Sequence, residues 1–235
     1  MAGLESFIPF IFVGFIALFG VLAYWGYKQN QKRLAALREW AAAQGFSFVE
    51  TEDWDTENRF ADFDCFKQGS RRYGYNFLQG RYRDFPATAF EYHYETYSKD
   101  KDGKQETHHH YFSAVILETG LPLKPLWIRP EGFFDRIGEF LGFDDIDFES
   151  AEFSRKFHVS AQDRRWAFDV LHQQAMEYLL TAPRLTLEMQ HGRIMARGDG
   201  CFDAVGYEGA METATKLIEM LPNSVRRELR DTTQQ

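Results

Sequence analysis

The run His108-His109-His110 is the group in this 235-residue sequence whose side chains are best suited to chemistry, with His93 not far before it. Imidazole nitrogens bind zinc and other transition metals when three or four ligands converge. If these histidines lie on paired strands, His108 and His110 share one face, because side chains alternate along a strand. Pairing across the intervening loop is expected to bring His93 close to one of them. We therefore take His93, His108 and His110 as the candidate metal ligands.

A simpler interpretation competes with a metal site, because histidines at a hairpin end beside a charged loop are usually just hydrated. The loop itself, residues 98–106, has oxygen-bearing side chains at offsets similar to those of an EF-hand calcium loop. The similarity fails at decisive positions, since Ser98 stands for the first ligand and His109 for the bidentate glutamate. No helix is expected before the loop either. The Asp102-Gly103 step is instead typical of a hairpin turn.

Other familiar chemistry finds little support. Cys65 has no nucleophile pattern around it, and Cys201 lies in a turn where Asp203 replaces the third glycine of a dinucleotide fingerprint. Carboxylates crowd residues 131–152, but a run of charge is usually a solvated face, and acid–base catalysis needs burial that a sequence does not show. Walker, G-x-S-x-G and H-E-x-x-H motifs are absent. A pI of about 5.4 argues against binding to nucleic acid.

These residues must be positioned by short strands, which the alternation of apolar and polar residues predicts in the first part of the chain. The predicted strands are 46–49, 72–82, 86–97, 108–118 and 123–128. Phenylalanines at helical spacing predict a short helix over residues 131–143. Further strands are predicted at 157–160, 185–190 and 193–197, the last two joined by a turn at His191-Gly192.

Helices complete the second part. Ser160 and Asp163 resemble a capping box that opens a helix running to about Leu180, and an apolar stripe predicts another helix from Ala210 to Leu221. Strands joined by short turns, with helices that do not alternate with them, predict an α+β domain with an antiparallel sheet over residues 46–225. Its composition dips at residues 144–152, which is a candidate seam between two lobes. Residues 226–235 are expected to form a polar, frayed tail.

The N-terminal segment, residues 1–27, is predicted to be a transmembrane anchor. Residues 7–25 form a run of nineteen without a charge, about the length that spans a hydrocarbon core of roughly 30 Å. A cleaved signal peptide would need basic residues before a shorter apolar core and small residues after it. The residues before this run include Glu5 and no Lys or Arg, and aromatic residues follow it. The helix is therefore expected to be retained, with the lipid bilayer as its partner.

Orientation is predicted by the basic residues that follow the apolar run, among them Lys28, Lys32, Arg33 and Arg38. Because Lys and Arg near a span stay in the cytoplasm, the N-terminus is expected outside and the domain in the cytoplasm, beneath the inner (plasma) membrane. Two cysteines in so long a chain agree with a reducing compartment. Residues 28–45 are predicted to continue as an amphipathic juxtamembrane helix, which ends at Gly45.

One stretch of the sequence carries a resemblance to a known family. The segment Glu152-Phe-Ser-Arg-Lys-Phe-His-Val fits the pattern E-F-x-R/K-x-F-x-V, and residues 176–180 fit M-E-x-L-L at a helix end. Here the chain resembles an uncharacterised bacterial family of membrane-anchored domains of unknown function, which implies no activity and no catalytic residue. In this interpretation Phe153, Phe157 and Val159 face a core, against which the next helix packs Phe168, Leu171, Ala175 and Leu179.

The sequence therefore favours a single-pass membrane protein that presents a non-catalytic binding or scaffold domain, with a protein or small ligand as partner and with no cofactor. Two alternatives stay open. One is a metal-assisted hydrolase that uses the histidine cluster. The other is a structural role in envelope assembly.

Overall fold

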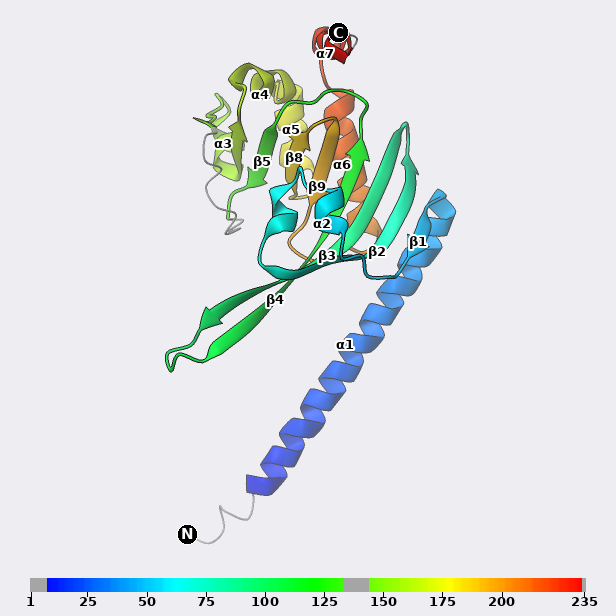
Figure 1. Ribbon diagram of the computed structural model, residues 1–235, viewed down its shortest axis with the longest axis vertical. Helices are drawn as coiled ribbons and strands as arrows, with labels where there is room; N and C mark the ends of the chain where they lie inside the picture. The colour runs from blue at the N-terminus through cyan, green and yellow to red at the C-terminus, as the bar shows by residue number, and fades with distance from the viewer. Residues whose placement is uncertain (1–7, 133–143, 234–235) are drawn as a thin grey trace.

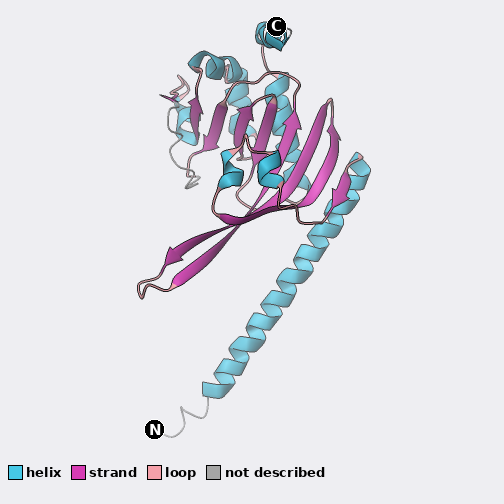
Figure 2. Ribbon diagram, viewed as in Figure 1, coloured by secondary structure: helices cyan, strands magenta, loops and turns pink. Residues whose placement is uncertain are grey.

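The computed structural model describes residues 8–132 and 144–233, with the side chains of the first helix described from residue 14 onward. Within these residues, nine strands form a single sheet in the order β1-β2-β3-β4-β9-β8-β5-β7-β6, and every neighbouring pair is antiparallel. Helices pack on both faces of the sheet (Figures 1 and 2). The predicted α+β class with an antiparallel sheet and packed helices is confirmed.

Helix α1, Ile8–Gln44, is one continuous element of 37 residues that projects far beyond the sheet (Figure 1). In its last third, Leu34, Leu37 and Ala41 are buried against the domain. The helix ends at Gln44. Gly45 follows it with a φ of +76°, which residues with a side chain adopt poorly.

In the part of the chain whose side chains are described, no helix combines the length and apolar character that a membrane crossing needs. Of the run predicted to span the membrane, residues 7–25, the side chains of residues 14–25 are described. Residue 7 lies outside the described residues. The described side chains of α1 that precede residue 28 are all exposed, apolar and aromatic ones included.

The first half of the sheet contains the short strand β1, Ser47–Val49, and the three longest strands: β2 Ser70–Tyr82, β3 Phe85–Lys99 and β4 Gln105–Glu118. The short helices α2, Thr56–Arg59, and η1, Asp64–Lys67, lie between β1 and β2 in the chain. Strands β3 and β4 form the predicted hairpin, whose far end leaves the body of the domain (Figure 1). In its turn, the Asp100 carboxylate accepts hydrogen bonds from the backbone N–H groups of Asp102 and Lys104 at 2.9 and 2.8 Å.

The second half of the sheet contains five shorter strands: β5 Leu126–Pro130, β6 Asp144–Asp145, β7 Phe157–Ala161, β8 Thr186–Gln190 and β9 Arg193–Arg197. Its helices are α3 Ala151–Lys156, α4 Arg164–Val170, α5 Gln173–Thr181, α6 Ala204–Glu219 and α7 Asn223–Thr233. One sheet includes strands from both sides of residues 144–152. The helix predicted at 131–143 falls mostly on residues 133–143, which lie outside the described residues.

Three predictions in this half need correction. The helix expected to run to Leu180 is interrupted at Leu171 and His172, and its cap is Asp163 alone, because Ser160 belongs to β7. Phe168 is 41% exposed rather than packed in the core. The polar tail forms α7, because Val225 and Leu229 recur at helical spacing and are buried.

The two faces of the sheet carry separate apolar clusters. The larger cluster lies under α1, α3, α4, α5 and α6 and includes Phe153, Phe157 and Val159 as predicted. The smaller one lies under α2 and η1 and is mostly aromatic: Phe66, Phe90 and Tyr92 pack with ring centroids 4.9–6.4 Å apart. Along β3, Ala87 and Ala89 belong to the larger cluster, whereas Phe90, Tyr92 and Tyr94 belong to the smaller one.

Leu37→Ala is expected to lower the free energy of unfolding by about 2–5 kcal/mol, because the Leu37 side chain of α1 is fully buried in the larger apolar cluster. Leu22→Ala in the same helix is the matched control, since Leu22 is 54% exposed and should change stability by less than about 0.5 kcal/mol. Urea denaturation of the full chain measures both values. Equal effects of the two substitutions would show that α1 does not pack as described.

Candidate functional site

The histidines of the hairpin lie on two opposite faces. In the register of β3 and β4, His93 pairs with Tyr111, Glu95 with His109, and Thr96 with His108. Side chains of directly paired residues share a face and alternate along each strand, so odd-numbered residues of both strands lie together. His93 therefore meets His109, whereas His108 and His110 point to the other side. The predicted ligand set of His93, His108 and His110 is not brought together, and this is a correction of the sequence interpretation.

A different set converges instead: His93, Glu95 and His109. Their ligand atoms all lie within 4.8 Å of one another. His93 Nε2 is 3.1 Å from His109 Nδ1, and His109 Nδ1 is 3.6 Å from Glu95 Oε1. His93 and Glu95 are 3% and 7% exposed, whereas His109 is exposed. The cluster thus has a buried floor and one side open to solvent.

His93 is held in a defined orientation. Its Nδ1 lies 3.2 Å from the backbone carbonyl oxygen of Arg71 and donates to it in the tautomer that leaves Nε2 with a lone pair. The rings of Tyr73 and Tyr111 pack against the imidazole at 4.7 and 4.8 Å between centroids. Burial lowers the pKa of His93, with the charge on His109 and Arg71 acting in the same direction. At neutral pH, His93 is a neutral acceptor aimed at His109.

Glu95 is held through both carboxylate oxygens. The Tyr97 hydroxyl donates to Glu95 Oε2 at 2.9 Å, and Arg71 Nε lies 3.5 Å from Oε1. The Arg71 side chain is 67% exposed, so its ion pair with Glu95 faces water. Glu95 Oε1 is therefore the carboxylate oxygen that faces His109 and the exposed Arg71 side chain.

The two other histidines have separate partners on the opposite face. His110 Nε2 lies 2.7 Å from the Thr96 hydroxyl, and its ring stacks on Tyr94 at 4.6 Å. His108 Nε2 lies 2.7 Å from the Ser98 hydroxyl near the hairpin end. Neither belongs to a convergent group of three metal-ligating side chains among the residues that the structure describes.

A buried polar junction ties α1 to the sheet, and sequence analysis missed it. Arg33 Nη1 and Nη2 donate to the two carboxylate oxygens of Glu91 at 2.7 and 3.2 Å. Arg33 Nη1 also donates to the carbonyl of Phe202, just before α6, at 2.6 Å. Glu91 is 1% exposed on the helix-covered face of β3. The guanidinium thus satisfies a carboxylate that would otherwise be buried without a counter-charge.

Further polar groups of this junction surround the ion pair. The Ser113 hydroxyl lies 3.1 Å from the Tyr207 hydroxyl and accepts from the Phe202 backbone N–H at 2.9 Å. The Tyr75 hydroxyl lies 3.7 Å from Cys201 Sγ. Loss of hydration, together with the negative charge of Glu91, raises the pKa of Cys201 to about 11. The thiol of Cys201, an exposed residue, is therefore mostly protonated at neutral pH.

A second buried carboxylate, Glu188, lies on the opposite face of the sheet in β8. It is 3% exposed and accepts a short hydrogen bond from the side-chain amide of Gln190. Burial raises its pKa to about 8. Asp64 raises this pKa further, whereas the hydrogen bonds of Gln190 and Trp127 and the charge of Lys67 oppose the rise. Glu188 is thus mostly a neutral acid in the folded protein at pH 7.

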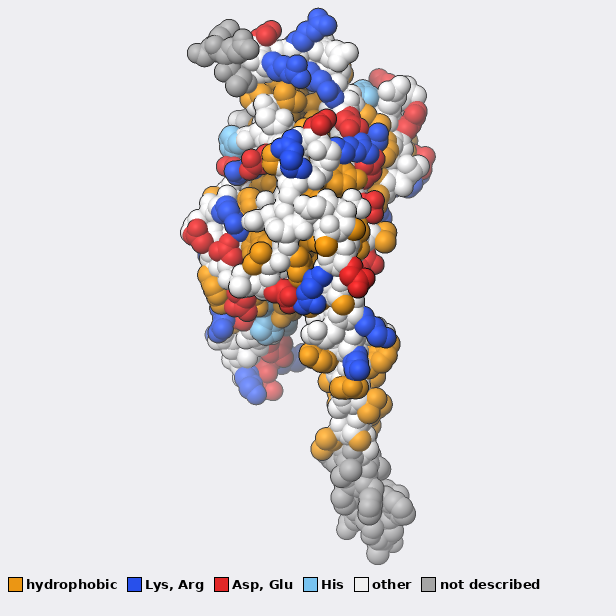
Figure 3. All heavy atoms as spheres, turned by 90° about the vertical axis from the view of Figure 1, so that its right-hand side faces the viewer, with side chains coloured by type: hydrophobic (Ala, Val, Ile, Leu, Met, Phe, Trp, Pro, Cys, Tyr) orange, Lys and Arg blue, Asp and Glu red, His pale blue; other side chains and the backbone are white. Residues whose placement is uncertain are grey.

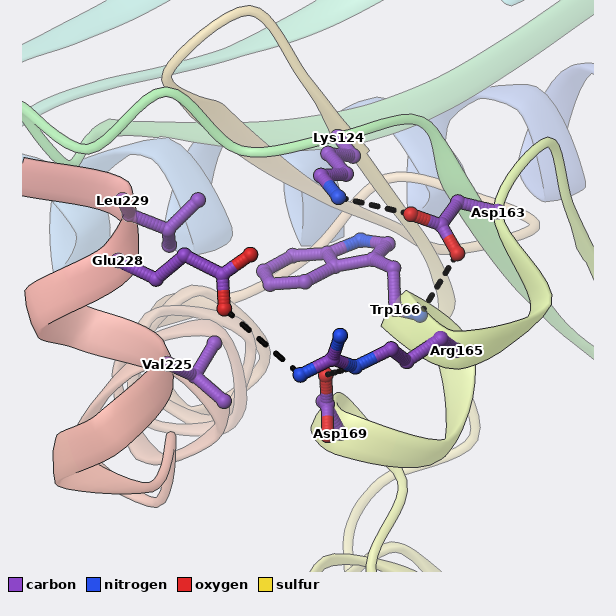
Figure 4. A pocket seen from close by; sticks show the side chains of 8 residues that line it. All are labelled: Lys124, Asp163, Arg165, Trp166, Asp169, Val225, Glu228 and Leu229. Carbon is purple, nitrogen blue, oxygen red and sulfur yellow. Dashed lines mark hydrogen bonds and ion pairs between the residues drawn. The ribbon is translucent and has the colours of Figure 1, made fainter. Parts of the chain in front are cut away.

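A small cavity of about 90 Å³ lies between α4 and α7 (Figure 4). Trp166 forms its floor, with the Lys124–Asp163 ion pair at 2.7 Å on one side. Arg165 lies on the other side, 3.9 Å from Glu228. Ligand pockets usually enclose several hundred cubic ångströms, and a water occupies about 30 Å³ in the liquid. This cavity has room for a few waters rather than for an organic ligand.

Arg33→Ala is expected to reduce the free energy of unfolding by about 3 kcal/mol, because it leaves Glu91 buried without its partner. Arg38→Ala is the matched control on the same helix, since the Arg38–Glu50 pair is exposed and contributes about 0–1 kcal/mol. Urea denaturation at pH 7 compares the two. A control as destabilising as Arg33→Ala would contradict a special role of the junction.

Glu188→Gln is expected to flatten the pH dependence of stability. The folded-state pKa of Glu188 is raised above its unfolded value, so its contribution to stability is full below about pH 4 and is lost as pH rises toward about 8. The wild type should lose stability over this window by several kcal/mol more than the variant. Urea midpoints at pH 5 and pH 8 measure the difference, and parallel losses in both proteins would contradict the assignment.

Comparison with known proteins gives one structural likeness. No protein-family model matches the sequence, and no curated protein matches it either. The chain is similar to the crystal structure of a mycobacterial trehalose monomycolate transport factor A, TtfA, with a TM-score of 0.57 and 12% sequence identity. The likeness covers 81% of this chain and 96% of that chain. At this identity, what the two proteins share is the fold.

Proposed function

We propose that the protein is a membrane-anchored, non-catalytic scaffold whose α+β domain works at the cytoplasmic face in envelope assembly or transport. The observation that carries this proposal is the exposed apolar surface of α1. The resemblance to a family of membrane-anchored domains is part of this proposal. A membrane anchor would explain why an apolar helix precedes an α+β domain.

Residues 14–25 of α1 are mostly apolar and uncovered on every side. Large side chains between residues 15 and 25 are 52–69% exposed, and their positions surround the helix rather than form one stripe: Phe15, Ile16, Leu18, Phe19, Val21, Leu22, Tyr24 and Trp25. Figure 3 shows these hydrophobic side chains gathered along the projecting part of the helix. A surface of this kind is stable only when something apolar covers it. A lipid bilayer covers a helix on all sides, whereas one protein groove covers a single face.

The polar end of this surface supports an interfacial position. Lys28 Nζ lies 5.7 Å from the centre of the Tyr24 ring, next to Trp25 in the chain. Aromatic and basic side chains gather where a span leaves the hydrocarbon, and basic residues remain on the cytoplasmic side. We therefore place the domain in the cytoplasm and the N-terminus outside.

The domain is held to this anchor without a flexible linker. Helix α1 continues unbroken from the apolar part into the part that packs on the sheet, where Arg33 pairs with Glu91. The end of the β3–β4 hairpin and the N-terminal part of α1 leave the same end of the sheet (Figure 1). With α1 in a bilayer, the hairpin would point toward the membrane surface, where a membrane-embedded partner could contact it.

The envelope role rests on the fold. The structure similar to this chain is that of a transport factor for trehalose monomycolate. We propose that this chain likewise assists the transport or assembly of an envelope component, as a partner of membrane proteins rather than as an enzyme.

The anchor is tested with the double variant Leu18→Arg/Leu22→Arg. Each Arg near the centre of a span costs about 2.5–3.5 kcal/mol of insertion, so the variant should move from the carbonate-washed membrane fraction to the supernatant. Val205→Arg is the matched control, because Val205 is an apolar residue of the domain that is 75% exposed. Wild type and control should stay with the membrane. A wild-type chain in the supernatant would overturn the anchor.

The orientation and role are tested separately. A reporter fused after Gln235 should be active in the cytoplasm, and its activity outside would overturn the topology. In the source bacterium, loss of the protein should raise sensitivity of the envelope to detergent, and Leu18→Arg/Leu22→Arg should fail to restore resistance although Val205→Arg restores it. Unchanged sensitivity on loss of the protein would contradict the envelope role.

A further inference from the structure

We propose that His93, Glu95 and His109 form a binding site for one divalent transition-metal ion, for which Zn²⁺ is the probe, with a fourth position open to solvent. This inference is independent of the proposed membrane role. It rests on three observations: the spacing of the ligand atoms, the support behind the two buried ligands, and the open side of the cluster.

The spacing of the ligand atoms suits a tetrahedral ion. Zinc binds histidine nitrogens at about 2.0–2.1 Å and carboxylate oxygens at about 2.0–2.2 Å, so two ligands of a tetrahedral site lie roughly 3.3–3.5 Å apart. The His93 Nε2 to His109 Nδ1 distance is 3.1 Å, and the His109 Nδ1 to Glu95 Oε1 distance is 3.6 Å. Shifts of a few tenths of an ångström would bring both pairs to the expected spacing. An ion would replace the direct contact between the two imidazoles.

Each of the two buried ligands has an outer partner of the kind that metal sites use. Metal-binding histidines usually donate their second N–H to a carbonyl or carboxylate, which fixes the ring and the tautomer. His93 Nδ1 meets the Arg71 carbonyl in this way at 3.2 Å. The Tyr97 hydroxyl holds Glu95 Oε2 at 2.9 Å and leaves Oε1 free to coordinate. The tyrosine rings on either side of His93 restrict its movement further.

Arg71 is the group that opposes a cation here, because its Nε lies 3.5 Å from Glu95 Oε1. The Arg71 side chain is 67% exposed, so it can turn into solvent at little cost when an ion takes its place. His109 is 51% exposed as a side chain, which gives the ion a direct path to the site and leaves room for a water as fourth ligand. Zinc sites with three protein ligands commonly hold a water at such an open fourth position.

The donor set selects among metals. Two imidazoles with one carboxylate suit Zn²⁺ and its transition-metal neighbours, whereas Ca²⁺ and Mg²⁺ prefer oxygen ligands throughout. A bound ion would join β3 to β4 at the point where the hairpin leaves the body of the domain. It would thereby stiffen the hairpin against fraying.

The test is isothermal titration of the metal-stripped full chain, purified without a histidine tag, with Zn²⁺ in excess Mg²⁺. The wild type is expected to bind one Zn²⁺ per chain, and Co²⁺ in its place should give the visible absorption of a tetrahedral site. Loss of an outer partner typically weakens metal binding roughly 10–100-fold, so Tyr97→Phe should weaken Zn²⁺ binding within that range. His109→Ala removes a ligand and should weaken Zn²⁺ binding more than that. His109 and Tyr97 are both exposed, so neither change should disturb folding, which the urea midpoint of the stripped proteins checks.

The matched control is the double variant His108→Ala/His110→Ala, which removes two imidazoles from the same strand on the opposite face. It should retain one Zn²⁺ per chain with affinity within about threefold of the wild type. Absence of Zn²⁺ binding by the wild type would overturn the proposal. So would loss of binding in the control with retention in His109→Ala, because binding would then belong to the exposed histidine run.

Discussion

The buried ion pair between Arg33 and Glu91 is the interaction on which the arrangement of this protein depends. Glu91 lies at a core position of β3, where an unpaired carboxylate would cost several kcal/mol. Arg33 comes from α1, 58 residues earlier in the chain, and also binds the Phe202 carbonyl that precedes α6. One guanidinium therefore connects the projecting helix, the central sheet and the start of the last long helix. Because α1 has no break before this contact, the direction of its apolar part follows from it.

On the sheet face that carries Glu91, the polar cluster of His93, Glu95 and His109 adjoins the hydrophobic core. Along β3, the side chains that begin in the core at Ala87 and Ala89 continue as Glu91, His93 and Glu95. Arg33 of α1 covers Glu91, whereas Glu95 is the last residue of β3 that pairs with β2 before the hairpin continues alone. The polar groups at the border are buried by tyrosine rings and by each other. This half-covered place, with one side open, is where a metal ion can reach buried ligands.

Much of the fold follows from local patterns in the chain. The alternation of residues in β2, β3 and β4, the Asp-Gly turn between the latter two, and the turn at His191-Gly192 all predict hairpins that the structure contains. Patterns were less reliable where packing overrides them. A helix predicted as one piece is broken at Leu171, and residues 223–233 are helical because Val225 and Leu229 find a surface to pack on. Polarity suggested a frayed end there, since two apolar residues among many charges are a weak signal.

The sequence by itself determined the α+β class, the positions of most strands and the apolar and basic character of the N-terminal segment, because these depend on spacing between neighbouring residues. It also placed histidines on one hairpin. Only the tertiary structure decided which of them meet, because a shift of register by one residue exchanges the two faces of a strand. That choice replaced His108 and His110 by Glu95 and His109 as companions of His93. The Arg33–Glu91 pair also needed the tertiary structure, since no local pattern joins residues so far apart in the chain.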